Sequence, residues 1–317
     1  MTAEHRSAPA GPPLRVGVAG AGATGGYLAT ALAGGHVEVT VLARGETATT
    51  VAREGLTVEG PDGSLLASRP RVVTATSPVD PVDVVLFCVK TYDTEQAADD
   101  VAGLLGGDGV VVCLQNGIAN EDALAARYGA ERVYAGVLYV GAERVAADRI
   151  RRHTPARVVL GPYEHGAREL HPSVAALVTA LHEADVAVTV DADVLAAKWQ
   201  KFLFNCGLNP LTALTGRRLG AIRATERGRA LFTTLVDEAA RVAQASGVTL
   251  APDVRDRVTA VADRMDISSS MAEDRAAGRR LELDAFSGHV LRLARRHGID
   301  TPVTATVHAL LEVVDAR

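Results

Sequence analysis

The residue types best suited to chemistry recur along one predicted helix, between Ala197 and Thr212. Four polar residues there follow one another at offsets of three, four and four, a spacing that places them on one helix face. They are Lys198, Lys201, Asn205 and Asn209. The other faces are largely apolar, with Trp199, Phe202, Leu203, Phe204 and Leu208. Burying amides or ammonium groups without partners costs several kcal/mol, so the pattern predicts either an internal polar network or a bound ligand.

The two lysines of this stripe are not equivalent. Lys201 is flanked by aromatic residues, which favours a role in a site. Lys198 lies nearest the start of the stretch, where a solvated surface position is the simpler interpretation.

A second candidate site is the glycine-rich stretch from Val16 to Tyr27. Gly20, Gly22 and Gly25 form a G-x-G-x-x-G pattern between an apolar strand and an alanine-rich helix. In that setting the glycines allow a tight turn, close approach of the backbone to a pyrophosphate, and close packing of helix on strand. The helix N-terminus then offers free N–H groups to phosphates. The predicted dinucleotide contacts of this loop are Gly20, Ala21, Gly22, Ala23, Thr24 and Gly25.

The residue after the second predicted strand, Glu38 to Ala43, bears on the choice of dinucleotide. An acid that binds the ribose 2′-hydroxyl is usual there in NAD-specific Rossmann proteins, but this chain has Arg44. A guanidinium binds phosphate oxygens in a bidentate way, so Arg44 predicts NADPH. The alternative is that Arg44 is a solvated surface residue and that Glu46 binds the ribose.

Two further polar positions follow continuous apolar runs, as expected of strands buried on both faces of a parallel sheet. Lys90 ends the run that begins at Val84, and Asn116 follows the run from Val110 to Leu114. Ligands bind outside the carboxyl ends of such strands, which would place both residues at the cofactor. Ordinary structural roles are an equal alternative for each of them.

Acidic and hydroxyl residues also cluster near the C-terminus. Ser268 to Ser270 predict an N-cap that opens a helix. Glu282 and Asp284 precede a regular helix from Phe286 to His297, closed by Gly298, and are equally well explained as first-turn acids. Four histidines lie in polar contexts without metal-ligand spacing, so no metal site is predicted; they are His153, His165, His171 and His182.

Length and composition predict how these segments are organised. A chain of 317 residues suits two domains, and the strand-rich pattern gives way to long helical patterns near Asp193. We therefore expect a tail over residues 1–13, an α/β domain over 14–192 and a helical domain over 193–317. The tail is expected to be disordered and lacks the apolar segment of a signal peptide.

The net charge indicates the class of partner, and the cysteine content indicates the cellular compartment. A net charge of −5 without charged blocks predicts small-molecule partners, and neither nucleic acid nor membrane. Three widely spaced cysteines, Cys88, Cys113 and Cys206, predict reduced thiols and a cytoplasmic protein.

Taken in order, these motifs resemble the ketopantoate reductase family, over nearly the whole chain after the tail. The family pattern is the glycine loop, a strand-end lysine, Q-N-G, K-x-x-x-N-x-x-x-N-P-L-T-A, S-S-M-x-x-D and a glutamate before I/L-D. Here these are Gly20 to Gly25, Lys90, Gln115 to Gly117, Lys201 to Ala213, Ser269 to Asp274, and Glu282 to Asp284.

The resemblance implies a Rossmann domain followed by an all-α domain similar to that of 6-phosphogluconate dehydrogenases, with NADPH as cofactor and a homodimer as the assembly. By likeness, Lys201 matches the catalytic lysine, and Glu282 matches the acid that binds the substrate hydroxyl and keeps Lys201 charged. The substrate contacts are Asn116, Asn205, Asn209 and Ser270. Lys90 matches a lysine near the cofactor, and Asn116 is expected at the cofactor as well. The implied reaction is the reduction of 2-dehydropantoate to pantoate, a step of pantothenate biosynthesis, with Lys201 as proton donor.

The chain also departs from the family pattern. An Asn-Gly-Glu element is replaced by residues 216–221, Leu281 stands for a usual threonine, and Ser287 stands for a common asparagine. These changes leave open the alternative of a reductase for a different 2-oxo acid or ketone. A further alternative, a non-catalytic NADPH-binding regulator, is disfavoured because such a protein has no need of Lys201 and Glu282.

Overall fold

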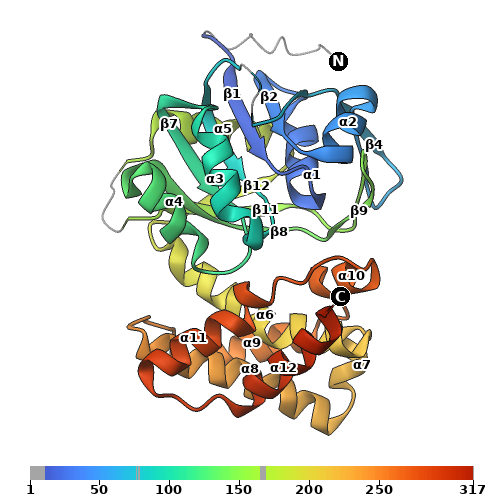
Figure 1. Cartoon of the computed structure of the whole chain (residues 1–317), viewed down its shortest axis with the longest axis vertical. Helices are drawn as coiled ribbons and strands as arrows, with labels where there is room; N and C mark the ends of the chain where they lie inside the picture. The colour runs from blue at the N-terminus through green and yellow to red at the C-terminus, as the bar shows by residue number, and fades with distance from the viewer. Residues whose placement is uncertain (1–10, 76, 78, 165–168, 317) are drawn as a thin grey trace, which may run out of the picture. The chain divides into compact units, whose positions relative to one another are not determined.

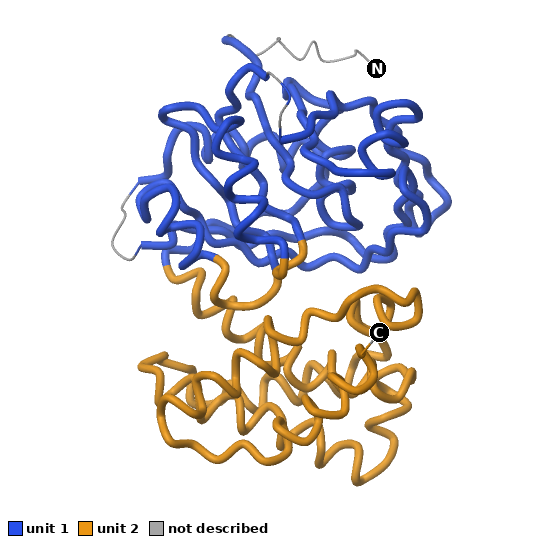
Figure 2. The backbone as a smooth tube through the Cα atoms, in the orientation of Figure 1, with its two compact units in different colours: residues 1–89, 93–115, 121–192 blue, residues 90–92, 116–120, 193–317 orange. Residues whose placement is uncertain are grey.

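The computed structural model describes residues 11–75, 77, 79–164 and 169–316, and it divides into two compact units. The first comprises Met1–Val89, Asp93–Gln115 and Glu121–Ala192. The second comprises Asp193–Arg317 together with two short segments, Lys90–Tyr92 and Asn116–Asn120 (Figure 2). Residues 1–10 of the expected tail and His165 lie outside the described residues. The predicted fold class is confirmed: an α/β unit and a helical unit (Figure 1).

The first unit is built on an eight-stranded sheet in the order β12-β11-β8-β7-β6-β1-β2-β5. Its strands are β1 (Leu14–Ala19), β2 (Val37–Leu42), β5 (Arg71–Val73), β6 (Val82–Phe87), β7 (Leu105–Cys113), β8 (Val133–Tyr139), β11 (Arg157–Pro162) and β12 (Ala187–Val190). All neighbours pair in parallel except β8 and β11. The strand order reverses between β1 and β6, where doubly wound sheets bind dinucleotides.

A second, four-stranded sheet belongs to the same unit. Its order is β4-β3-β10-β9, from β4 (Leu65–Ser68), β3 (Leu56–Glu59), β10 (Arg149–Arg152) and β9 (Ala142–Ala146). The sequence carries no strand signal at β9 and β10, where Arg144, Arg149 and Arg151 are exposed. Ile150 of β10 packs so closely on the first helix that a Cβ at Gly26 would lie 2.7 Å from it.

The helices of the first unit connect these strands. They are α1 (Ala23–Leu32), α2 (Gly45–Glu54), α3 (Thr94–Ala102), α4 (Asn120–Tyr128) and α5 (Pro172–Glu183), with a short 3₁₀ turn at Ala130–Arg132. A further 3₁₀ turn, Thr91–Asp93, lies where the chain passes from the second unit back to the first. Helix α1 contacts strands of both sheets, so its glycines are constrained on two sides.

The second unit packs its helices around α6 (Val194–Thr215). The others are α7 (Leu219–Arg223), α8 (Glu226–Ala245), α9 (Val254–Asp263), α10 (Ser270–Ala276), α11 (Ser287–His297) and α12 (Pro302–Asp315), with a 3₁₀ turn at Leu283–Ala285. Phe202 of α6 stacks on Phe286, and Gly207 lets the ring of Phe232 lie directly against the α6 backbone. The predicted helix at 286–297 is confirmed to within one residue, and Gly298 ends it in the left-handed conformation at φ +65°.

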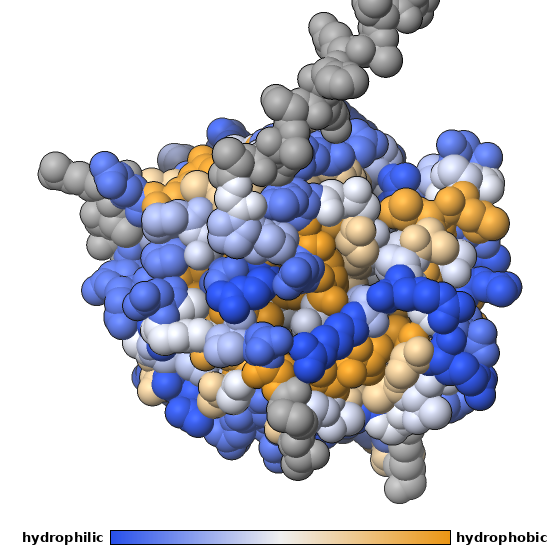
Figure 3. Space-filling model, turned by 90° about the horizontal axis from the view of Figure 1, so that it is seen from above, coloured by the Kyte–Doolittle hydropathy of each residue, from blue (hydrophilic) through white to orange (hydrophobic). Residues whose placement is uncertain are grey.

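The surface mixes polar and apolar side chains. On the face in Figure 3, hydrophilic side chains surround several small apolar groups. Large apolar residues that are exposed include Leu65 and Leu66 on β4, and Leu310, Val313 and Val314 on α12. No helix in the described part of the chain is both long and apolar enough to cross a membrane.

All three cysteines are free thiols, and burial raises the pKa of Cys88 to about 12.

Candidate functional site

The glycine loop has the geometry that its sequence predicts. Gly20 has φ +96°, and a Cβ there would lie 3.1 Å from the backbone nitrogen of Val89. A Cβ at Gly25 would lie 2.0 Å from the carbonyl oxygen of Gly20, so only glycine allows α1 to pack here. Gly22 differs from both, because a Cβ there would meet no atom within 4 Å.

Gly22 is also the N-cap of α1, and no side chain caps this end of the helix. The backbone N–H groups of the first turn, which begins at Ala23, therefore have no side-chain acceptor, while Gly22 leaves open space in front of them. An uncapped helix N-terminus behind a residue without a side chain fits the pyrophosphate of a dinucleotide. Ala21 and Thr24 complete the loop.

Arg44 follows β2 as the N-cap of α2. Its side chain is about half exposed at 51%, and its Nη2 lies 3.3 Å from Oδ2 of Asp100 on α3. Glu46, the alternative ribose ligand, lies in the first turn of α2 and is exposed.

Lys90 and Glu282 meet in a buried ionic network within the second unit. Lys90 Nζ donates to Glu282 Oε2 at 2.9 Å and to Asp274 Oδ2 at 2.6 Å. The backbone N–H of Thr91 donates to Glu282 Oε1 at 2.8 Å, and Arg279 Nε donates to Asp274 Oδ1 at 2.8 Å. Burial disfavours the charged form of Lys90, but the two carboxylates outweigh burial and hold its pKa above the ordinary value.

This network changes two expectations for Glu282. Its carboxylate is 8% exposed and is held by Lys90 and Thr91, and α11 begins only at Ser287, so it is not a first-turn acid of that helix. It was also expected to keep Lys201 charged, and here the structure differs. The pKa of Lys201 is lowered to about 7, first by burial and then by the like charge of Lys198.

The two lysines of α6 also differ from expectation. Lys198 was expected in solvent, but it is only 4% exposed, whereas Lys201 is partly exposed. The reason is that α6 begins at Val194, so Lys198 lies in the second turn of the helix and not at its end. A buried ammonium one turn from Lys201 disfavours protonation of Lys201, which is how the pKa of a proton donor is brought close to neutrality.

The two asparagines of the stripe are buried on the same helix, Asn205 at 8% and Asn209 at 3% exposure. Across residues 11–75, 77, 79–164 and 169–316, neither side-chain amide makes a hydrogen bond to the protein, and neither belongs to the fully buried polar atoms that lack a partner. The two residues are thus mostly buried while their amide atoms stay accessible, which suits them to bind a polar ligand.

The remaining predicted substrate contacts are Ser270 and Asn116, and Ser269 is the predicted helix cap beside Ser270. Thr212, one turn beyond Asn209, bonds Ser269 (Oγ1 to Oγ 2.7 Å), and Ser269 caps α10, as predicted. Ser270, the first residue of α10, is exposed. Asn116 is half-buried, and its carbonyl oxygen accepts from Nδ2 of Asn120 at 2.8 Å.

Sequence reasoning assigned no role to two carboxylates that the structure pairs with predicted site residues, Asp274 with Lys90 and Asp100 with Arg44. Asp274 belongs to the S-S-M-x-x-D motif, which could have indicated its importance. Asp100 has no such signal, because its partner Arg44 is 56 positions away and the pairing depends on the fold.

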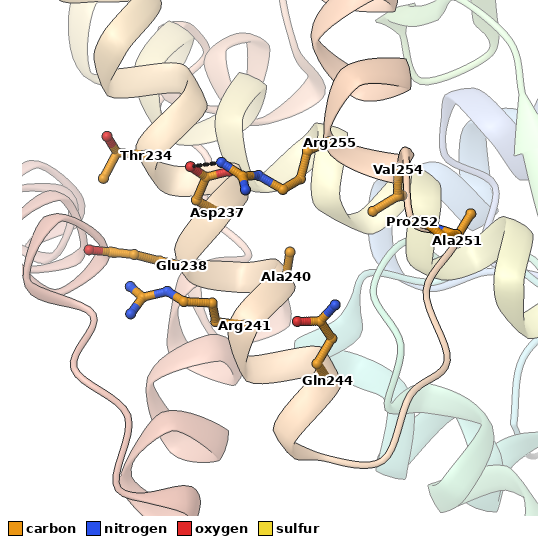
Figure 4. A pocket seen from close by; sticks show the side chains of 10 residues that line it. All are labelled: Thr234, Asp237, Glu238, Ala240, Arg241, Gln244, Ala251, Pro252, Val254 and Arg255. Atoms are coloured by element: carbon orange, nitrogen blue, oxygen red, sulfur yellow. Dashed lines mark hydrogen bonds and ion pairs between the residues drawn. The ribbon is translucent and has the colours of Figure 1, made fainter.

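A cavity of about 400 Å³ lies elsewhere in the second unit, between α8 and the start of α9 (Figure 4). Asp237 and Arg255 form an ion pair in it, and the carboxylate of Glu238 accepts from the backbone N–H groups of Val303 and Thr304. None of the predicted site residues lines this cavity, so we do not assign it to the substrate.

Comparison with known proteins identifies the family of this chain. The family model described as ketopantoate reductase PanE/ApbA matches residues 16–165, and the model for the C-terminal part of the same family matches residues 193–315. The chain belongs to the ketopantoate reductase family.

Individual members of the family are similar over nearly the whole chain. The 2-dehydropantoate 2-reductase of Halobacterium salinarum is 36% identical, covering 95% of this chain and 98% of that protein. The enzyme of the same name from Caulobacter vibrioides is 35% identical, covering 93% and 97%. The crystal structure of a PanE/ApbA family ketopantoate reductase from Ralstonia eutropha superposes with a TM-score of 0.85 at 32% identity, covering 95% and 98%.

Three positions at which this chain departs from the family pattern, Ser287, Leu281 and Gly216, have defined contacts or conformations in the structure. The hydroxyl of Ser287 bonds His308 Nδ1 at 2.8 Å, and Leu281 is buried in the apolar core of the second unit. Gly216 ends α6 in the left-handed conformation at φ +64°. The three positions therefore have defined structural roles of their own.

Proposed function

We propose that this oxidoreductase catalyses the NADPH-dependent reduction of a 2-oxo acid, with ketopantoate as substrate and pantoate as product. The observation that carries the proposal is the buried stripe of α6. It combines Lys201, whose pKa is lowered to about 7, with two buried amides that have no protein partner among the described residues. Family membership supplies the reaction class.

The residues of the chain bind the substrate and supply the proton, whereas the cofactor supplies the hydride. When bound, NADPH supplies the hydride that adds to the keto carbon. The ammonium of Lys201 hydrogen-bonds the keto oxygen and donates the proton that converts it to a hydroxyl. The amides of Asn205 and Asn209 orient the substrate, and Glu282 accepts a hydrogen bond from the substrate hydroxyl.

The same proposal assigns the cofactor contacts. The uncapped N-terminus of α1 binds the pyrophosphate across Gly22, and Arg44 binds the 2′-phosphate that distinguishes NADPH from NADH. Lys90 and Asn116 stay predictions as cofactor contacts, and Asn116 and Ser270 as substrate contacts. Lys90 is held by Glu282 and Asp274, which supports a role in positioning Glu282.

A panel of 2-oxo acids tests the substrate. We expect NADPH oxidation with ketopantoate, measured by the loss of NADPH absorbance, to exceed that with other branched 2-oxo acids. Preference for another acid would favour the second candidate, a reductase of a different 2-oxo acid, which the departures at Leu281 and Ser287 motivate. Binding of NADPH without turnover of any acid would favour a regulator.

A homodimer and a cytoplasmic location stay predictions. The exposed apolar residues Leu310, Val313 and Val314 share one face of α12 and support self-association. Light scattering of the purified chain measures its mass in solution, and a monomer at micromolar concentration would contradict the homodimer.

A further inference from the structure

The ion pair of Arg44 has no role in the proposed function as stated so far. Arg44 follows β2, and Asp100 lies on α3, which follows β6. Strands β2 and β6 are the two neighbours of β1 in the sheet. The ion pair therefore joins the two segments that follow the neighbours of β1, the strand that leads into the glycine loop.

The two partners differ in burial. The Asp100 side chain is 9% exposed, and its Oδ1 accepts from Nε2 of Gln96 at 3.0 Å, while Oδ2 faces Arg44. The Arg44 side chain is 51% exposed and extends from the N-terminus of α2. Removing the partner of a nearly buried carboxylate is costly, so we expect the contact to persist when a ligand binds.

The contact leaves most of the guanidinium available. Arg44 has five N–H donors, and Nη2 is the group that faces Asp100. Within the part of the chain that the structure describes, the Arg44 side chain makes no other hydrogen bond or ion pair. Both bidentate edges of a guanidinium include Nη2, paired with Nε on one side and with Nη1 on the other. Nη2 carries two hydrogens, so an edge that Asp100 does not occupy can still bind a phosphate in the bidentate way that suits arginine.

We propose that Asp100 is a positioning residue that holds the Arg44 guanidinium in place and thereby sets the preference for a 2′-phosphorylated dinucleotide. This inference rests on the proposed function, in which Arg44 binds the 2′-phosphate. An arginine that is already held loses less side-chain freedom when it binds phosphate than a mobile one does. The carboxylate also repels the phosphate, an effect of opposite sign that alone would make Asp100→Ala bind NADPH more tightly.

The test compares ligands that differ only in the 2′-phosphate. Dissociation constants of the purified full chain are measured by calorimetry for NADPH and NADH, and for the fragments 2′,5′-ADP and 5′-AMP. Asp100→Ala is expected to weaken NADPH and 2′,5′-ADP by roughly three- to tenfold, the effect of one newly mobile side chain. NADH and 5′-AMP are expected to bind as they do to the wild type.

Two further variants control for folding and for charge. Asp100→Asn keeps the size of the side chain and is expected to change affinity in the same direction by less, which keeps the test valid if Asp100→Ala does not fold. Asp99→Asn removes a neighbouring charge on α3 whose side chain is 67% exposed, and it should change no affinity.

Arg44→Ala separates failure of the inference from failure of the proposed function. If Arg44→Ala weakens NADPH and NADH equally, Arg44 is not the phosphate ligand and the cofactor proposal fails. If Arg44→Ala is selective but Asp100→Ala leaves NADPH affinity unchanged or improves it, the positioning role is overturned and the cofactor proposal stands. In the Arg44→Ala background, adding Asp100→Ala should cause no further loss of NADPH selectivity.

Discussion

At the scale of single residues, Lys198 and Lys201 place two cationic groups one turn apart on α6. Lys198 is 4% exposed, and its charge together with burial lowers the pKa of Lys201 to about 7. A proton donor acts best when its pKa lies near the working pH. Lys198 is thus expected to influence catalysis through Lys201, and not to be silent as its sequence position suggests.

This role predicts a shift in pH dependence. Lys201 must be protonated to donate, so kcat should be highest below its pKa and should fall as pH rises through about 7. Lys198→Met removes the like charge, which raises the pKa of Lys201 and moves this limb of the kcat profile to higher pH. Arg217→Met, which removes an exposed cation beyond the end of α6, serves as the control. An unmoved limb in Lys198→Met would show that Lys198 does not act on the donor.

Glu282 gives a second prediction at this scale. Glu282→Gln retains a hydrogen-bond acceptor but removes the charge that pairs with Lys90 at 2.9 Å. Hydrogen bonds to charged groups contribute about 1.5–3 kcal/mol, so kcat/KM for the oxo acid should fall roughly tenfold to a hundredfold. Asp284→Asn is the matched control, because its side chain is 80% exposed. Equal kinetics in the two variants would remove Glu282 from the site.

At the scale of elements, we assign the proposed cofactor contacts to the N-terminus of α1 and the proposed substrate contacts to one face of α6. The glycine pattern predicts the first element closely, because Gly20 and Gly25 are positions where a Cβ would collide with backbone atoms. Gly22 has no such collision, and the open space beside it is where we propose that the pyrophosphate binds.

Gly22→Ala tests this distinction. The added methyl group meets no atom within 4 Å, so the melting temperature without cofactor should stay close to that of the wild type. The methyl group would occupy the path by which the backbone approaches a pyrophosphate, so the rise in melting temperature on adding NADPH should be largely lost. A variant that NADPH still stabilises fully would argue against pyrophosphate binding at α1.

The same elements show why the sequence predicts which residues share one face of α6 but not which of them are buried. Helical spacing places Lys201, Asn205 and Asn209 on one face, and the structure buries both asparagines there. Spacing does not give the start of a helix: α6 begins at Val194, three residues before Ala197, and Lys198 is buried in its second turn. Strands β9 and β10 were missed because exposed, arginine-rich strands lack the apolar alternation that indicates a strand.

At the scale of the whole molecule, the predicted site residues are divided between two units, and neither unit is continuous in sequence. The glycine loop and Arg44 belong to the first unit, whereas Lys90, Asn116, Lys201 and Glu282 belong to the second. The segments Lys90–Tyr92 and Asn116–Asn120 follow strands of the first unit but group with the helices of the second. A boundary drawn in sequence order, as at residue 193, cannot show that Lys90 reaches Glu282, because their pairing spans 192 positions.

The most direct test of the proposed reaction is the kcat of Lys201→Ala for NADPH-dependent ketopantoate reduction. A positioned proton donor contributes about 10²–10⁴-fold to rate, so kcat should fall by that order. Circular dichroism and NADPH titration should show a folded variant with wild-type affinity for the cofactor, because the glycine loop and Arg44 lie in the other unit. The pH-dependent limb near 7 should disappear at the same time. A kcat within a few-fold of the wild type, in folded protein that binds NADPH normally, would contradict the assignment of Lys201 as the proton donor.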